Sequence, residues 1–170
     1  MKPENGTPSS GFAIRRADEG DLCHVEALLI ALLRDQAELD PALRLRSGVE
    51  GEMRRRVQAM LANRDLAVFL GFGAEPKTQR VAAGLCTVRI DLAPPILEER
   101  RRGEISELYV QEAARRRGLG RGLARTALAH ARELGVRRLE VRVSTHNREG
   151  QAFWRALGFR DFMDVLDLRL

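Results

Sequence analysis

One stretch of the chain decides the fold: Glu104-Ile-Ser-Glu-Leu-Tyr-Val-Gln-Glu-Ala-Ala-Arg-Arg-Arg-Gly-Leu-Gly-Arg-Gly122. Its start predicts a strand over Glu104–Val110, and its end predicts the beginning of a helix over Leu119–Leu134. Between them, Gly118 and Gly120 remove side chains where a ligand would approach the backbone. Because the free N–H groups of a first helical turn and the helix dipole both favour an anion, the stretch predicts an anion-binding turn.

Positive charge is concentrated in the same region. The 170-residue chain has a formal net charge of +5, whereas residues 111–138 contain eight arginines and two glutamates, so the rest of the chain is close to neutral. This distribution indicates a site for a localised polyanion, and a solvated helix face is the alternative. Four arginines surround the turn and can add charge-assisted hydrogen bonds: Arg115, Arg116, Arg117 and Arg121. The turn lacks the Lys-Ser/Thr pair of a Walker A loop and the spacing of the dinucleotide fingerprint.

Working outward, hydrophobic periodicity predicts the other elements. We expect strands over residues 12–17, 66–72, 80–90, 136–143 and 165–170, with a hairpin connection at 75–79 and a loop over 91–103. We expect helices over residues 21–36, 47–62 and 149–157, the first capped by Asp18 or Asp21 and the second by a Ser47–Glu50 capping box. The pattern is that of one α+β domain with a mixed sheet.

Composition excludes several classes of protein. With 44% hydrophobic residues, the chain is neither disordered nor fibrous, and we expect a loose tail over residues 1–11 and a single domain over 12–170. Its longest apolar run, Ala27–Leu33, is far shorter than the roughly 20 residues of a membrane span. No signal-like segment occurs near residue 1, so we expect a cytoplasmic location.

Neither the cysteines nor the histidines suggest metal or redox chemistry. Cys23 and Cys86 lie among apolar residues, and we expect both to be buried, reduced thiols. The three histidines have no ligand-like spacing, so no metal site is predicted.

These motifs resemble those of the GNAT superfamily of acetyl-CoA-dependent N-acetyltransferases. The segment Arg115-x-x-Gly118-x-Gly120 matches the signature Gln/Arg-x-x-Gly-x-Gly/Ala, and it follows Val110, which matches the end of the central strand of the family. A second element, Asn followed by a short helix and an aromatic-x-x-x-Gly-Phe tail, is matched by Asn147, Phe153, Trp154, Gly158 and Phe159. The resemblance implies a three-layer GNAT-like fold with a mixed, mostly antiparallel central sheet flanked by helices.

The resemblance also implies a site for acetyl-CoA as cosubstrate. The pantetheine arm would pair with the backbone of Leu108, Tyr109 and Val110. The pyrophosphate would bind the amides of Arg115, Arg116, Arg117, Gly118, Leu119, Gly120 and Arg121. Asn147 would meet the pantetheine where two strands splay apart, and Trp154 would pack against it. Trp154 stands where many members have a tyrosine that protonates the departing thiolate, a role that an indole cannot fill.

The implied reaction is direct attack of a primary amine on the thioester. Such an amine has a pKa near 10.4, so presenting it neutral at pH 7 costs about 4–5 kcal/mol, and a base is useful. The candidate bases are Glu107 and Glu104, acting through water, with Ser106 between them. Regular alternation places Glu104 and Ser106 on one face and Glu107 on the other, although the strand carries a bulge in this family. The alternative is that both are solvated carboxylates or partners of nearby arginines.

The resemblance leaves several assignments open. The acceptor is an amine of a small molecule or peptide, and Asp35, Glu38 and Asp40 can attract a cationic one such as a polyamine, an aminoglycoside or a protein N-terminus. A catalytically weak, regulatory acyl-CoA-binding domain is the main alternative function, and a nucleic-acid-binding module is a weaker one. A free sheet edge or the last strand can support a homodimer.

Overall fold

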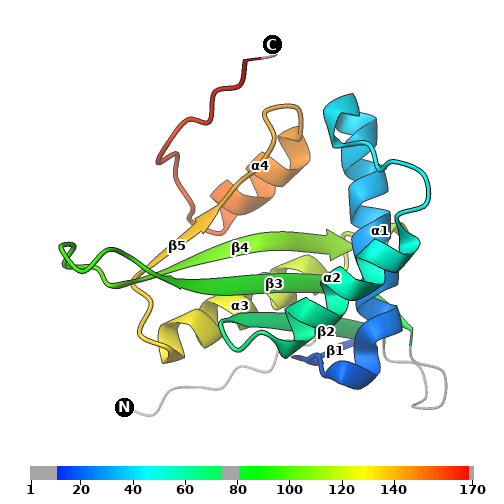
Figure 1. Cartoon of the computed structure of the whole chain (residues 1–170), viewed down its shortest axis with the longest axis horizontal. Helices are drawn as coiled ribbons and strands as arrows, with labels where there is room; N and C mark the ends of the chain where they lie inside the picture. Colours follow the sequence, from blue (N-terminus) through cyan, green and yellow to red (C-terminus); the bar gives the residue numbers. More distant parts are fainter. Residues whose placement is uncertain (1–10, 74–80, 169–170) are drawn as a thin grey trace.

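The computed structural model describes residues 11–73 and 81–168, and these contain a five-stranded sheet of order β1-β2-β3-β4-β5 (Figure 1). Its strands are β1 (Phe12–Arg16), β2 (Leu66–Gly73), β3 (Ala82–Leu92), β4 (Arg101–Val110) and β5 (Arg138–Val141). All neighbours pair antiparallel except β4 and β5, which are parallel. The prediction of a mixed, mostly antiparallel sheet is therefore confirmed.

Helices cover both faces of the sheet, which gives three layers (Figure 1). The helices are α1 (Leu22–Leu39), α2 (Glu50–Ala62), α3 (Leu119–Glu133) and α4 (Arg148–Ala156). The strand residues alternate between two cores, as the period of a pleated strand requires. On β2, for example, Val68 and Leu70 pack with α1 and α2, whereas Phe69 packs with α3.

Helix α3 lies close to the sheet because its buried face is made of small residues. Ala124, Ala127 and Ala131 are at most 2% exposed, with Leu119 and Leu123 beside them. This packing fixes the position of the first turn of α3, where the sequence predicts an anion.

The two parallel strands separate part-way along the sheet. Pairing of β4 with β5 runs only from Arg102↔Arg138 to Ile105↔Val141, whereas β4 continues to Val110 (Figure 1). From Ser106 onward β4 therefore has strand pairing on its β3 side only. Such a splay leaves backbone N–H and C=O groups available to a ligand.

Some predicted boundaries are wrong. The N-cap of α2 is Val49, with no side-chain cap, so the Ser47 capping box does not form. The expected loop over 91–103 is shorter, since β3 and β4 extend to Leu92 and Arg101, and the strand expected over 136–143 is only four residues long. The connection at 75–79 lies outside the described residues.

Two other expectations also fail. Residues 165–168 form no strand, and Val165, Leu166 and Leu168 are exposed, because no strand edge pairs with them. Cys86 is buried as expected, but Cys23 is exposed, because it follows Leu22 on the outward side of α1. None of the described helices is both long and apolar enough to span a membrane.

Candidate functional site

The turn before α3 presents a row of free backbone amides. Gly118 has φ +87° and is the N-cap, and the first helical hydrogen bond joins Gly122 N to Gly118 O at 3.0 Å. The amides of residues 116–121 donate to no acceptor in the described parts of the chain. Because unpaired amides at a helix start attract anions, the turn has the geometry that the sequence predicts for a phosphate.

The side chain of Leu119 anchors this turn from below. Leu119 is 1% exposed and its methyl groups occupy the space above Gly71 on β2 and Gly84 on β3. A Cβ on Gly71 would overlap Leu119 Cδ1, so the absence of a side chain there lets the helix start lie directly on the sheet.

The four arginines of the turn have different surroundings. Arg115 is held between strand and helix: its Nε donates to Val110 O at 2.9 Å and its Nη2 to Asp35 on α1 at 2.6 Å. Arg116 pairs with Glu149 at 2.6 Å on the surface. Arg117 lies over the ring of Phe12. Arg121 is exposed and has no ion-pair partner among the residues described.

Asn147 has a structural contact in the loop between β5 and α4. It is the N-cap of α4, and its Oδ1 accepts from Gly150 N at 2.8 Å. Gln151, which the sequence analysis did not single out, donates from Nε2 to the carbonyls of Ser144 (3.0 Å) and Thr145 (3.1 Å). The sequence signal for Gln151 was a polar residue in the first turn of a capped helix. Asn147 and Gln151 together fix the loop between β5 and α4.

Trp154 belongs to the core. Its side chain is 6% exposed, and its ring lies edge-on to those of Phe153 and Phe159, with centroids 5.0 and 5.1 Å away. Phe153, rather than Trp154, is the aromatic residue beside Gly120. Contact of Trp154 with a pantetheine arm stays a prediction.

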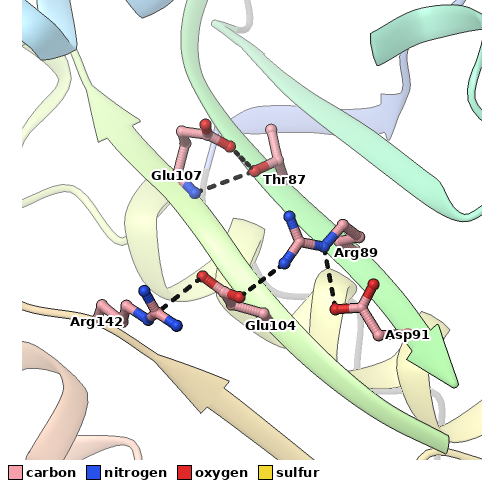
Figure 2. Close-up of polar contacts among 6 residues, drawn as sticks. All are labelled: Thr87, Arg89, Asp91, Glu104, Glu107 and Arg142. Atoms are coloured by element: carbon pink, nitrogen blue, oxygen red, sulfur yellow. Dashed lines mark hydrogen bonds and ion pairs between the residues drawn. The ribbon is translucent and has the colours of Figure 1, made fainter. Parts of the chain in front are cut away.

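A bulge in β4 decides where the two candidate bases point. Thr87 on β3 lies opposite Glu107, whereas the next residue, Val88, lies opposite Ile105, so Ser106 is an extra residue. Glu104 therefore lies on the same face as Glu107, and the alternation that placed them on opposite faces is wrong (Figure 2).

Both oxygens of the Glu107 carboxylate are bound. The buried hydroxyl of Thr87 donates to Oε2 and accepts from Glu107 N at 3.0 Å (Figure 2). Arg56 on α2 donates to Oε1 at 3.0 Å. The Glu107 side chain is 13% exposed. On the other face of β3, burial raises the pKa of the Cys86 thiol, and the charge of Glu107 adds to this. Sequence reasoning missed Thr87 and Arg56; the one weak signal was a Thr in an apolar strand.

Glu104 is the centre of a chain of opposite charges. Arg89 Nη2 lies 3.0 Å from its Oε2 and Arg142 Nε lies 4.0 Å from its Oε1 (Figure 2). Arg89 also contacts Asp91 through Nε at 3.1 Å. The Glu104 side chain is 22% exposed. The carboxylate is thus the partner of two arginines, one of the alternatives that the sequence left open.

Two of the acidic residues predicted to attract a cationic acceptor already have partners within the protein. Asp35 binds Arg115, and the carboxylate of Asp40 accepts from Ala42 N at 2.9 Å to cap a 3-10 turn. Tyr109 lies beside Asp35, and its pKa is raised by burial first and by that negative charge second. Its phenol is therefore neutral and protonated at pH 7.

Comparison with known proteins identifies the fold and the family. The family model described as Acetyltransferase (GNAT) family matches residues 36–159. The chain belongs to the GNAT acetyltransferase family. As a member of this family, the protein is an acyltransferase. A search of curated proteins gives no match.

Solved structures resemble this GNAT chain over nearly its whole length. A tetramutant of the BH1408 protein from Bacillus halodurans is 21% identical with a TM-score of 0.79, covering 93% of this chain and 99% of that one. The aminoglycoside N-acetyltransferase AAC(6')-Iy, solved with CoA, is 20% identical with a TM-score of 0.71, covering 96% and 98%. A predicted acetyltransferase from Clostridium acetobutylicum, solved with acetyl-CoA, is 20% identical with a TM-score of 0.70, covering 93% and 96%. At such identities the similarity shows the fold.

The GNAT fold brings two chemically different surfaces close to β4. The free amides at the start of α3 and the unpaired edge of β4 from Ser106 to Val110 can hold an extended, anionic ligand. The face that carries Glu104 and Glu107 can hold and deprotonate an amine. Within the described residues, no three His, Cys, Asp or Glu side chains gather as metal ligands do.

Proposed function

We propose that this GNAT protein transfers an acetyl group from acetyl-CoA to a primary amine of a small molecule or peptide by direct attack. The observation that carries the proposal is the row of amides over residues 116–121, which have no acceptor among the described residues. Such a row fits the diphosphate of coenzyme A, and the exposed Arg121 adds positive charge.

The chain supplies a place for each part of the cosubstrate. The amides at the start of α3 would bind the diphosphate, and the β4 backbone at Leu108, Tyr109 and Val110 would pair with the pantetheine arm. When bound, the thioester supplies the activated acetyl group. The remaining residues hold the amine and move its proton.

Glu107 is the better placed of the two candidate bases. It lies on β4 beyond the last residue paired with β5, beside the open edge, whereas Glu104 lies where the two strands still pair. Arg56 and the Thr87 hydroxyl bind the two carboxylate oxygens and fix the orientation of the side chain. In the proposed mechanism Glu107 accepts the amine proton through a water molecule.

The departing thiolate needs no dedicated acid. A thiol of pKa near 8.5 leaves as an anion that water can protonate. Trp154 is unsuited to this role by its chemistry, and the protonated phenol of Tyr109 lies on the strand that would bind the pantetheine.

Replacing each glutamate tests the proposal. With acetyl-CoA and a panel of amines, thiol release by Glu107→Gln should fall at least tenfold, and by Glu104→Gln less. Affinity for CoA, measured by calorimetry, should stay within threefold in both, because the amides over 116–121 are untouched. A loss below tenfold in both variants rejects a carboxylate base.

The pairing of both glutamates with arginines favours one second candidate, a domain that binds acyl-CoA without turning it over. A carboxylate whose oxygens already accept hydrogen bonds from a guanidinium has fewer lone pairs free for a water molecule or an amine. Tight binding of acetyl-CoA without thiol release across the amine panel would support this candidate over the enzyme.

A further inference from the structure

The face of the sheet that carries both glutamates has no excess of negative charge: its carboxylates are matched by arginines, and Arg102, opposite Asp91, adds a further positive charge. Its carboxylates each lie within 4.0 Å of an arginine: Glu107 with Arg56, Glu104 with Arg89 and Arg142, Asp91 with Arg89, and Glu140 with Arg138. A polycationic acceptor needs an excess of negative charge, because each extra ammonium group placed among guanidinium groups is repelled. The balance therefore disfavours a polyamine or an aminoglycoside.

Arg142 presents an exposed guanidinium on this face. It follows Val141, the last β5 residue paired with β4, and so lies where the two strands begin to separate. Its side chain is 78% exposed, and in the described residues its ion-pair partner is Glu104, at 4.0 Å through Nε. Since a guanidinium has five N–H donors, most of them remain free to bind a carboxylate. Figure 2 shows Arg142, the residue just after β5, reaching toward Glu104.

The spacing along β4 sets the size of the acceptor. Glu104 and Glu107 are two pleated steps apart once the bulged Ser106 is discounted, which is about 7 Å at the usual rise per residue. An amine held at Glu107 thus has a guanidinium near Glu104 at the distance of a short carbon chain.

We propose that the acceptor is an ω-amino acid or a dipeptide-sized molecule whose primary amine lies at Glu107 and whose carboxylate binds Arg142. The proposal deepens the acetyltransferase function and rests on it. Arg89, which bridges Glu104 and Asp91, keeps Glu104 from competing for Arg142. The bound carboxylate then replaces the weak contact between Arg142 and Glu104.

The test uses acceptors that differ only in charge. The principal pair is 6-aminohexanoate, whose ends lie about 7 Å apart when extended, and its uncharged amide. Amino acids with their amides, cadaverine and spermidine complete the panel. We expect kcat/KM to be at least tenfold higher for 6-aminohexanoate than for its amide, and higher than for either polyamine.

Arg142→Gln should bring the ratio of acid to amide close to one, because the variant removes the guanidinium. Arg132→Gln is the matched control and should keep the ratio, because Arg132 is an exposed arginine on α3, the helix that covers the opposite face of the sheet from Glu107. Equal or faster turnover of cadaverine or spermidine overturns the inference and leaves the acetyltransferase function intact. Acetyl-CoA binding without turnover of any amine overturns both.

Discussion

The turn before α3 and the sheet face at Glu107 lie on neighbouring segments but handle charge in opposite ways. In the turn, amides over residues 116–121 and the exposed Arg121 have no protein partner among the described residues, so an arriving anion finds free donors. On the sheet face, each carboxylate already has an arginine. The proposed cosubstrate site therefore depends on backbone geometry, whereas the proposed acceptor site depends on paired side chains, and we expect the two to respond differently to substitution.

Breaking the backbone side should have the largest effect. Gly118→Asp places an L-residue at φ +87° and a negative charge among the free amides. We expect CoA affinity, measured by calorimetry, to fall at least 100-fold, because about two charge-assisted hydrogen bonds of roughly 1.5 kcal/mol each are lost.

Gly135→Asp provides the control for backbone strain and charge. Gly135 has φ +76° at the far end of α3, with nothing within 4 Å of an added Cβ. It should bind CoA within threefold of the unmodified protein. An equal loss in both variants would mean that destabilisation, rather than a ligand site at Gly118, explains the result.

On the sheet face, Thr87 is the positioning residue to test, because its hydroxyl bonds both the carboxylate and the backbone N–H of Glu107. Thr87→Val keeps the shape but leaves Glu107 Oε2 and Glu107 N without their hydroxyl partner. We expect kcat to fall about tenfold with KM for acetyl-CoA unchanged, and the free energy of unfolding to fall by about 1–3 kcal/mol.

Thr87→Ser separates the chemical role from packing. It retains the hydroxyl but removes a buried methyl group, so it should be less stable yet keep kcat within threefold. If Ser and Val variants lose kcat equally, the hydroxyl does not orient Glu107.

A reference for both regions is an ion pair distant from any proposed ligand. Arg15 donates to both oxygens of the buried Asp21, at 2.6 and 2.7 Å, and this hydrogen bonding lowers the pKa of Asp21 below 3.8 despite burial. Since the folded state binds this proton less readily than the unfolded chain, the pair stabilises the fold above pH 4, and the stability is lost as pH falls through the lowered pKa.

Asp21→Asn should therefore lower the free energy of unfolding at pH 7 by about 1–3 kcal/mol and remove part of the acid sensitivity, with no change in CoA affinity. Denaturant unfolding at pH 7, 5 and 3 measures both effects. Asp161→Asn, which disrupts an exposed pair with Arg155, should change stability by less than about 0.5 kcal/mol. Equal effects of the two substitutions would contradict the assignment of stability to the Asp21 pair.

The features that the sequence predicted well are local ones. The turn before α3 depends on glycines and arginines a few residues apart, and the strands β2 and β3 follow from apolar runs within each segment. The bulge at Ser106 depends instead on how β3 pairs with β4, which alternation within one strand cannot reveal. The contact of Arg56 with Glu107 joins residues far apart in the chain, so it requires the fold.

The failed last strand has a related cause. Residues 165–168 alternate apolar and charged side chains as a strand does, but a strand also needs a neighbouring edge for its hydrogen bonds, and these residues have none in the described chain. The alternating pattern shows that these residues suit a strand, but it does not show whether a partner strand is available.

Because the Leu119 side chain packs on Gly71 and Gly84, residues of β2 and β3 help to set the position of the turn before α3. A methyl group added at Gly71 would lie 2.4 Å from Leu119 Cδ1, so the Leu119 side chain would have to shift, although β2 contributes nothing to the proposed ligand contacts. We expect a shift of this anchor to change affinity for the proposed cosubstrate from the opposite side of the helix, leaving every ligand-facing residue as it is.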